Sequence, residues 1–398
     1  MLNVLVLTKD VNVLREGTVA RKAMEEYATL AKHIFVVVLN DRKDRYKTQK
    51  VSDALWIFPT NSWTWWLAPF DALRKVKREV WFQGHLQADI ISAMDPCESG
   101  LAGVWVARDS GRPLQVHVEH DIFDPHFMAE SLANRIRLRI ARYVLEKATT
   151  IRAATERIRA SLAEFSVAIG DKAIMVPRYI DVEQLANEPV RVNLHEKYPT
   201  FRFIILMVAP LVKDQNIEFA LLILQGVLRY YEYTGLVIVG DGPEKKRLQA
   251  LVKKVGLEHK VAFERSGENI SSYYKTANVF LVTALYEEYG DTIAEAAACG
   301  CAVVASNVGI ASTVIQNGVS GFLCNPIEPE SFVRSIALIM QNTGIRERLR
   351  INSHLFFENR VGQDKNQYLQ YYTDAWQKTY DAGQKAIEIT PEHYTAPK

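Results

Sequence analysis

The residues best suited to chemistry are two glutamates, Glu287 and Glu295, on either side of Gly290. The sequence around them predicts a buried strand, a tight loop through Gly290 and a helix of very small residues. Backbone N–H groups at the start of such a helix lack partners within the helix and attract anions. Carboxylates on both sides could accept hydrogen bonds from the hydroxyls of a ligand whose phosphate lies on these N–H groups. This combination suits a nucleotide-sugar.

The same residues also allow a purely structural interpretation. Thr292 and Glu295 have the spacing of a capping box, in which Glu295 would bond back to the helix start. Asp291 could equally be a simple N-cap. For Glu295 alone the two interpretations are evenly matched, and the complete set of residues favours the functional one.

A glycine turn follows another predicted strand in the run Leu236–Leu248. Gly240 and Gly242 begin like a dinucleotide-binding fingerprint, but Lys245 stands where the third glycine should be. A nicotinamide or flavin cofactor is therefore disfavoured. The remaining interpretations are a tight turn near a nucleotide base and a surface helix with Pro243 at its first position.

Three histidines, His117, His120 and His126, follow or end a predicted strand of the first half. Residues three apart on a strand point to opposite faces, so His117 and His120 are poor ligands for one metal ion. We therefore expect no metal and a single histidine, His120, acting by hydrogen bonding. A structural histidine is the competing interpretation.

Length and composition describe an ordinary globular protein of at least two domains. The chain has 398 residues, 48% apolar and 24% charged, with a formal net charge of +2. Four cysteines without a leader sequence predict a reducing, cytoplasmic compartment. The first residues, 1–8, predict a strand, not a signal peptide or a membrane span.

Short apolar runs alternate with amphipathic runs, which predicts an α/β protein with two doubly wound parallel sheets. The expected domains are 1–185, 186–363 and a closing segment, 364–398, whose helix at Asp364–Tyr380 crosses back onto the first domain. The irregular segment Asp181–Thr200 is the predicted linker. The predicted strands are Asn3–Thr8, Ile34–Leu39, Ala54–Phe58, Ile90–Ala93, Leu114–Glu119, Thr150–Ala153, Ala173–Val176, Phe203–Ala209, Leu236–Val239, Val261–Phe263, Val279–Val282, Ala302–Ala305 and Gly321–Leu323.

Two stretches of the first half are rich in cations. The span Arg135–Arg159 holds eight basic and two acidic residues, a balance of +6, and Trp63–Phe70 sets aromatic rings beside the basic run Leu73–Arg78. Tryptophan with lysine and arginine is typical of a bilayer interface, which predicts peripheral membrane contact. The alternative is a solvated helix face with core tryptophans. Nucleic acid is disfavoured because the net charge is near neutral and no nucleic-acid module is present.

Taken together, the chain resembles the family-4 glycosyltransferases, which are retaining enzymes with the GT-B fold of two Rossmann-like domains facing a central cleft. The strongest match is Glu287 to Glu295 followed by residues 296–305, then 240–243 and 317–323. Weaker matches lie at 89–96, at the strand ending near His120 and at 176–181.

The resemblance implies roles for individual residues. Glu287 would contact hydroxyls of the donor sugar, Glu295 would hold the nucleotide ribose, and His120 would approach the sugar from the first domain. The reaction would retain the anomeric configuration without a metal or any other cofactor, the leaving phosphate helping to take the acceptor proton. The other donor-binding residues it implies are Gly290, Asp291, Thr292 and Ile293 for the diphosphate, Gly17 in a loop near the phosphates, and Gly240, Gly242 and Arg265 near the base.

The chain departs from the family pattern where relatives place two cations on the diphosphate. Pro210 stands in the arginine position and Gln215 in the lysine position. Lys213, Arg178 or Arg265 would have to compensate. Ile310, Thr313 and Glu288 also replace usual residues.

The sequence thus predicts a hexosyltransferase-type enzyme of polysaccharide or glycolipid assembly. It would act on a nucleotide-sugar donor and a glycan or lipid-linked acceptor, in the cytoplasm or peripherally at the inner face of the membrane, and without nucleic acid. The alternatives are a catalytically degraded protein that binds a nucleotide-sugar or a partner glycosyltransferase, and a nucleotide-sugar epimerase.

Overall fold

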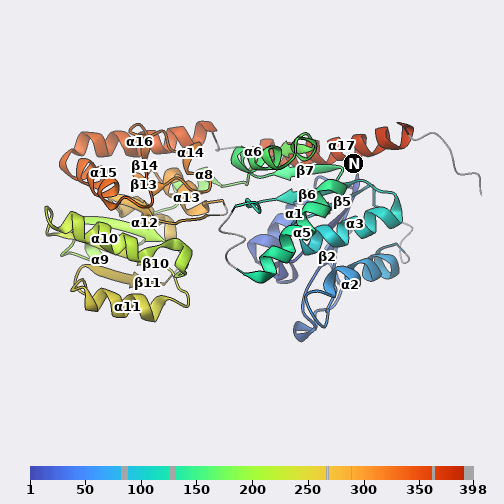
Figure 1. Cartoon of the computed structure of the whole chain (residues 1–398), viewed down its shortest axis with the longest axis horizontal. Coiled ribbons are helices and arrows are strands. Elements are labelled where there is room, and N and C mark those ends of the chain that lie inside the picture. The colour runs from blue at the N-terminus through green and yellow to red at the C-terminus, as the bar shows by residue number, and fades with distance from the viewer. Residues whose placement is uncertain are drawn as a thin grey trace, which may run out of the picture. The chain divides into compact units, whose positions relative to one another are not determined.

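The computed structural model describes residues 1–81, 88–124, 131–265, 267, 269–287, 289–360 and 364–389. Its contacts divide the chain into two compact units (Figure 1). Unit 1 comprises Met1–Arg178 together with the chain from Asn366 onward, and unit 2 comprises Tyr179–Lys365. The division thus falls between Arg178 and Tyr179, whereas the sequence placed it after residue 185.

Unit 1 contains an eight-stranded sheet with the order β3-β4-β2-β1-β5-β6-β7-β8. All its pairings are parallel except the one between β3 and β4. The central strands are continuous apolar runs because helices cover both faces of a parallel sheet. The strands are β1 Asn3–Thr8, β2 His33–Val38, β3 Gln49–Lys50, β4 Leu55–Pro59, β5 Ile90–Ala93, β6 Leu114–Val118, β7 Thr150–Ala153 and β8 Ala173–Met175.

The helices of unit 1 connect these strands. Thr18 and Ser131 cap two of them through their side chains, because each hydroxyl accepts a hydrogen bond from an N–H of the first turn. The helices are η1 Val11–Leu14, α1 Val19–Ala28, η2 Arg42–Asp44, α2 Ala68–Lys75, the π-helix η3 Val76–Trp81, α3 Glu98–Ser110, α5 Leu132–Lys147, α6 Glu156–Phe165, α7 Val167–Gly170 and the long closing helix α17 Lys365–Ile389.

Unit 2 contains a six-stranded, wholly parallel sheet with the order β11-β10-β9-β12-β13-β14. Its strands are β9 Phe203–Val208, β10 Thr234–Val239, β11 Val261–Glu264, β12 Val279–Val282, β13 Val303–Ser306 and β14 Gly321–Cys324. Its helices are α8 Val182–Asn187, α9 Leu194–Lys197, η4 Lys213–Gln215, α10 Ile217–Leu228, α11 Lys245–Lys254, α12 Ile270–Thr276, α13 Asp291–Ala298, α14 Ala311–Val314, α15 Pro329–Gln341 and α16 Thr343–Arg360.

Two predictions about the elements are wrong. The segment Asp181–Thr200 is not irregular, because it forms the short helices α8 and α9 within unit 2. Pro243 is not the first residue of its helix, because α11 begins at Lys245. The preceding residues form a turn, in which Lys245 N donates to Gly242 O at 3.2 Å. The edge strand β3 escaped prediction because two polar residues carry no apolar period.

Helix α17 packs on unit 1 through aromatic and hydroxyl side chains. Tyr372 stacks on Tyr27 of α1 with ring centroids 4.3 Å apart. Thr379 lies 2.6 Å from the Thr150 hydroxyl and accepts a hydrogen bond from Gln115 at 2.8 Å. These partners lie on α1, β6 and β7, so the closing helix covers buried polar groups of the first sheet.

A buried cation lies beneath this helix. Arg152 on β7 is almost fully buried, and its guanidinium donates to the Tyr372 hydroxyl and to His117 Nδ1, the latter at 3.1 Å. His117 Nε2 therefore carries the proton and donates to Ser92 Oγ at 2.9 Å. Burial, together with the charge of Arg152, lowers the pKa of His117 well below its usual value. His117 is thus a neutral structural residue.

Candidate donor-binding site

The junction between β12 and α13 begins with a left-handed glycine. Gly290 is the N-cap of α13 with φ 93°, and no side chain caps this helix. Asp291 is therefore not the N-cap, and the capping box of Thr292 and Glu295, the alternative structural interpretation, does not form. Gly290 O accepts from Ile293 N at 3.0 Å, so a backbone turn starts the helix.

Glu295 bonds to α12 and not to the start of its own helix. The hydroxyl of Tyr274 donates to Glu295 Oε2 at 3.0 Å. Burial raises the pKa of Glu295, and the charge of Asp291 adds to this, while the Tyr274 bond opposes it. The sequence analysis missed Tyr274, because one tyrosine in a short helix gives no signal of its partner.

Glu287 is held by the residue that stands in the usual lysine position. Gln215 Nε2 donates to Glu287 Oε1 at 2.8 Å, and Gln215 is only 7% exposed. The Thr283 hydroxyl donates to Gln215 O at 3.0 Å and lies 3.2 Å from the carbonyl oxygen of Asn216. Gln215 thus orients a carboxylate, and its amide supplies no positive charge for a diphosphate.

Three cations were candidates to compensate for the missing arginine and lysine. Lys213 is in the same 3-10 turn as Gln215 and is exposed. Within the part of unit 2 that the structure describes, no hydrogen bond or ion pair joins its Nζ to another residue. Arg265 is exposed near Asp241, whose pKa is lowered by the Gly242 N–H and then by nearby cations. Arg178 belongs to unit 1 and pairs with Glu119 at 3.5 Å.

Gly240 and Gly242 are required by close packing of the backbone. A Cβ on Gly240 would lie 1.9 Å from Ala209 O, and one on Gly242 would lie 2.5 Å from Leu211 O. Leu211 N in turn donates to Asp241 O at 2.9 Å. The glycines therefore let the loop after β10 lie directly against the loop after β9, which contains Pro210 and Lys213.

The predicted residues of the first half lie in unit 1. His120 is half-buried and follows the end of β6 by two residues. Its neighbour Asp121 accepts from Phe123 N at 3.1 Å and from Ser161 Oγ at 2.8 Å, which holds this turn. Gly17 is exposed with φ 78°, and a Cβ there would meet nothing within 4 Å, so its backbone conformation explains the glycine. His126 and Glu288 lie outside the described residues.

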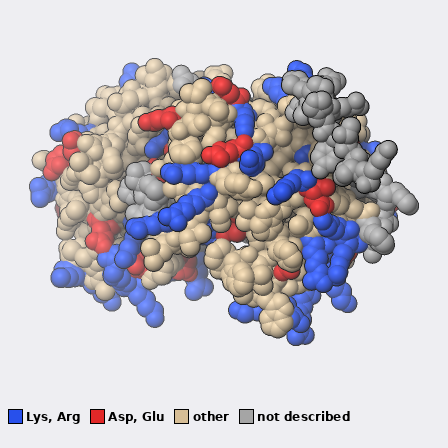
Figure 2. Space-filling model, turned by 45° about the vertical axis from the view of Figure 1, so that its right-hand side comes forward, with Lys and Arg blue, Asp and Glu red and all other residues tan. Residues whose placement is uncertain are grey.

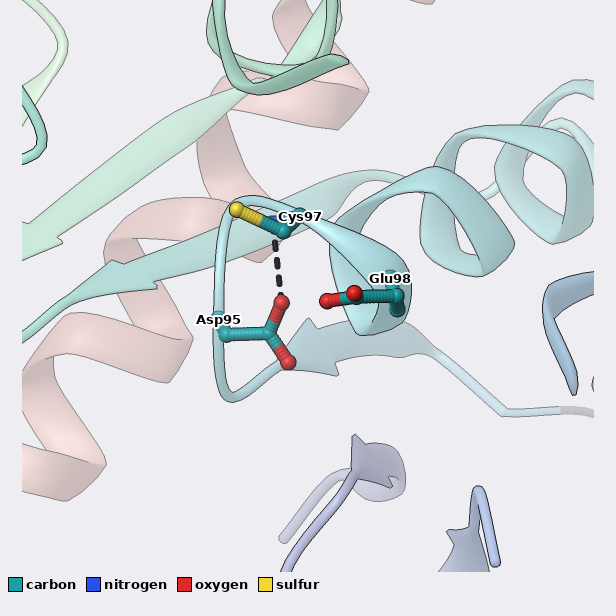
Figure 3. Close-up of side chains that lie close together, drawn as sticks. All are labelled: Asp95, Cys97 and Glu98. Atoms are coloured by element: carbon teal, nitrogen blue, oxygen red, sulfur yellow. Dashed lines mark hydrogen bonds between the residues drawn. The ribbon is translucent and has the colours of Figure 1, made fainter. Parts of the chain in front are cut away.

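One cluster of possible metal ligands is present in the described part of unit 1. Oxygen and sulfur atoms of Asp95, Cys97 and Glu98 lie within 4.8 Å of one another at the end of β5 (Figure 3). Two cations already occupy this cluster: Lys9 Nζ lies 2.9 Å and Arg137 Nε 2.8 Å from the Glu98 carboxylate.

These charges make the cluster a poor cation site. The two carboxylates are balanced by the lysine and the arginine, which would repel a metal ion. Burial and the neighbouring carboxylates raise the pKa of Cys97 to about 12, so its sulfur is a protonated thiol and not a thiolate ligand. The sequence had noted Asp95 only as part of a weak motif.

The folds of the two units define a class of protein. Each unit is a parallel-sheet α/β domain of Rossmann type, as in GT-B glycosyltransferases, and this fold was predicted. Two family models match: "Glycosyl transferase 4-like domain" over residues 17–178 and "Glycosyl transferases group 1" over residues 194–355. The chain belongs to the family-4-like glycosyltransferases, as its motifs predicted.

Relatives and a solved structure agree with this family. The chain is 23% identical over 292 residues to an alpha-D-kanosaminyltransferase of Streptomyces kanamyceticus, covering 70% of this chain and 73% of that one. It is 24% identical over 251 residues to an alpha-monoglucosyldiacylglycerol synthase of Streptococcus pneumoniae, covering 60% and 56%. Across such curated relatives the matched stretch spans from 23% to 73% of their length.

The fold is shared with HepE of Anabaena, whose crystal structure in complex with UDP superposes with a TM-score of 0.73 at 18% identity, covering 94% of this chain and 99% of that one. None of the described helices has a stretch long and apolar enough to cross a membrane.

Proposed function

We propose that this protein transfers a sugar from a nucleotide-sugar to a glycan or lipid-linked acceptor with retention of the anomeric configuration. The observation that carries the proposal is the pair of oriented carboxylates around α13. Glu287 is held by Gln215 at 2.8 Å, and Glu295 is held by Tyr274 at 3.0 Å. Both partners are neutral donors, so neither bond neutralises the negative charge of its carboxylate, and both bonds fix the carboxylate's orientation.

In the proposed reaction the bond between the sugar's anomeric carbon and the phosphate oxygen breaks, and the new bond to the acceptor oxygen forms on the same face. The acceptor proton passes to the leaving phosphate, so no metal is needed. Glu287 would hold the sugar hydroxyls and Glu295 the ribose. The N–H groups of Gly290, Asp291 and Thr292 would face the diphosphate, where the helix start favours negative charge. The N–H of Ile293, which the sequence also suggested, instead donates to Gly290 O.

Base and sugar recognition complete the proposal. Gly240, Gly242 and Arg265 would lie near the base. In unit 1, His120 would contact the sugar, and Gly17 would belong to a loop near the phosphates. A UDP-sugar is the first donor to test, because HepE holds UDP in its crystal structure. A lipid acceptor agrees with the name of the Streptococcus pneumoniae relative. The enzyme would serve polysaccharide or glycolipid assembly on the cytoplasmic side of the membrane.

Turnover of UDP-, GDP- and ADP-sugars by the full chain tests the proposal. The Glu287→Gln variant should lose at least about 100-fold in kcat/KM, the loss typical of a removed group that stabilises charge in the transition state. Glu258→Gln, a change of the same kind on an exposed turn of unit 2, is the matched control and should leave turnover unchanged. NMR of the product should show the donor's anomeric configuration. Equal rates for both variants would refute the role of Glu287.

A second candidate function is favoured by Pro210 and Gln215, which leave the loop after β9 without the usual cations. In that case the protein would bind a nucleotide-sugar or a partner glycosyltransferase without catalysis. Thermal shift read together with turnover separates the two candidates. A bound nucleotide at 100 times its dissociation constant stabilises the folded protein by about 2.7 kcal/mol whether or not the protein is a catalyst. Stabilisation without turnover of any donor would select the binding protein. Release of a free sugar derivative without acceptor would select an epimerase.

A further inference from the structure

An aromatic surface of unit 1 is open to solvent. The rings of Trp63, Trp65, Trp66 and Phe70 are between 53% and 73% exposed. The sequence left open whether these tryptophans are core residues, and the structure excludes that interpretation. We call these four residues, with the exposed faces of α2 and α5, the tryptophan surface. Arg137 of α5 lies 5.6 Å from the Trp65 ring centroid, which joins its two parts.

The part of this surface on α2 and the residues next to it combines rings and cations at intervals of four residues. Phe70 and Arg74 lie on α2, and Arg78 lies on the π-helix η3 that follows it. Trp66, Phe70 and Arg74 are four residues apart, and Arg78 follows at the same interval. All four are exposed. Among the side chains that the structure describes, Arg74 and Arg78 have no carboxylate partner, whereas the two lysines between them are paired with Glu79 and Asp109.

The part on α5 repeats this combination. Leu132 and Ile136 are exposed at i and i+4, and Leu132 is 74% exposed. Arg135 and Arg139 are exposed beside them, also without a carboxylate among the described residues. Helix α5 has five basic residues and one acidic residue, a balance of +4. Both α2 and α5 pack against α3.

Basic side chains gather on one part of the molecular surface. In the space-filling view, Lys and Arg side chains gather at the lower right beside surface that carries neither charge (Figure 2). A surface of apolar rings surrounded by unpaired cations needs an occupant that is both apolar and anionic.

We propose that the tryptophan surface docks onto an anionic lipid bilayer. Tryptophan and phenylalanine favour the boundary between headgroups and acyl chains, and unpaired arginines bind the lipid phosphates. Stable anchoring needs two signals, which the rings and the cations supply together. A second copy of this chain is a poor occupant, because its identical surface would bring arginines against arginines. The proposal does not depend on the proposed transferase reaction.

Vesicle co-sedimentation of the full chain tests this. We expect binding to phosphatidylcholine vesicles that contain about a third of phosphatidylglycerol, weak binding to pure phosphatidylcholine, and weakening by added salt. Tryptophan fluorescence should shift to the blue on binding, because the exposed indoles leave water. Equal binding to both kinds of vesicle, or no binding, would overturn the proposal.

Two double variants localise the surface. Arg74→Glu/Arg78→Glu should lower the partition coefficient by roughly 30-fold or more, because each cation near an anionic surface contributes about a factor of five. Trp66→Ser/Phe70→Ser should lower it at least about tenfold and reduce the blue shift. The matched control is Lys253→Glu/Lys254→Glu on α11, which makes the same charge change on an exposed helix of unit 2.

All variants should keep the wild-type circular dichroism spectrum and melting temperature, because every changed side chain is exposed. A control variant that loses as much binding as the α2 variants would overturn the assignment to this surface. Two further results would also overturn it: a stable dimer in solution in which these indoles are shielded, or binding of an unstructured RNA that exceeds vesicle binding at equal salt.

Discussion

The bond between Tyr274 and Glu295 makes a prediction about stability that depends on pH. The Tyr274 side chain is fully buried, and its hydroxyl is 3.0 Å from a carboxylate that is itself mostly buried. Tyr274→Phe removes the hydroxyl and little else. A hydrogen bond to a charged group contributes about 1.5–3 kcal/mol to stability, and one between neutral groups about 0.5–1.5 kcal/mol. The variant should therefore lose more stability when Glu295 is ionised than when it is protonated.

The direction of the pH dependence follows from the pKa of Glu295. Burial raises this pKa in the folded protein above its ordinary value of 4.5, so between these two values the folded state binds the proton more tightly than the unfolded state. The stability that protonated Glu295 contributes is fully present below the ordinary value and is lost as pH rises through the folded pKa. Tyr274→Phe removes a bond that favours the charged form, so it raises this pKa further and steepens the loss towards neutral pH.

Urea unfolding followed by far-ultraviolet circular dichroism measures this effect. All seven tryptophans lie in unit 1, so tryptophan fluorescence does not report directly on unit 2, which holds this bond. At about pH 7.5 the free energy of unfolding should fall by about 1.5–3 kcal/mol, and the melting temperature of a unit of this size by roughly 3–12 °C. At about pH 4 the loss should shrink to about 1 kcal/mol.

Two variants serve as controls for this experiment. Tyr230→Phe removes an exposed hydroxyl from the same unit and should change stability by less than about 0.5 kcal/mol. In Glu295→Gln the effect of Tyr274→Phe should no longer depend on pH. A loss in the single variant that is the same at both pH values, or smaller than the control's, would refute the assignment of this bond as charge-assisted.

Three further predictions concern other contacts. Gln215→Lys places an ammonium beside the Glu287 carboxylate and should tighten UDP binding at least about tenfold in calorimetry, whereas the affinity for uridine, the control, should not change. An unchanged UDP affinity would mean that this loop does not contact the diphosphate. Gly240→Ala forces a methyl group to within 1.9 Å of a backbone oxygen and should cost about 3 kcal/mol in urea unfolding, and a cost below 1 kcal/mol would contradict the packing. Tyr372→Phe removes the hydroxyl that accepts a hydrogen bond from the buried guanidinium of Arg152, and it should lower the free energy of unfolding by about 1.5–3 kcal/mol. Urea unfolding followed by tryptophan fluorescence measures this loss, and no change would mean that water replaces the hydroxyl.

Much of the architecture could be predicted because local sequence patterns specify the strands and helices. Apolar runs that are buried on both faces give parallel strands, and runs such as Asn3–Thr8 and Ile90–Ala93 match β1 and β5 residue for residue. The predictions failed where the sequence has no clear hydrophobic periodicity. Strand β3 is only two residues long, and helices α8 and α9 lie in a segment that contains prolines and residues of mixed charge.

In the candidate site, too, some residues could be predicted from local sequence and others could not. Sequence spacing predicted Glu287, Gly290 and Glu295 as site residues, because a strand, a glycine turn and a helix follow one another within twenty residues. It could not identify their partners. Gln215 is 72 positions from Glu287 and Tyr274 is 21 positions from Glu295, so only the packing of one element on another sets these bonds.

By itself, then, the sequence determined the two α/β units and the family, and it selected the pair of glutamates as candidates, because each of these is encoded by residues close together in the chain. The tertiary structure decided what the glutamates bond to, why the glycines at 240 and 242 cannot carry a Cβ, and which tryptophans face water. The physical reason is that a hydrogen bond or a steric contact depends on a distance of a few ångströms between strands, helices and loops. Local periodicity fixes the elements, whereas the packing of elements that are remote in the sequence fixes those distances.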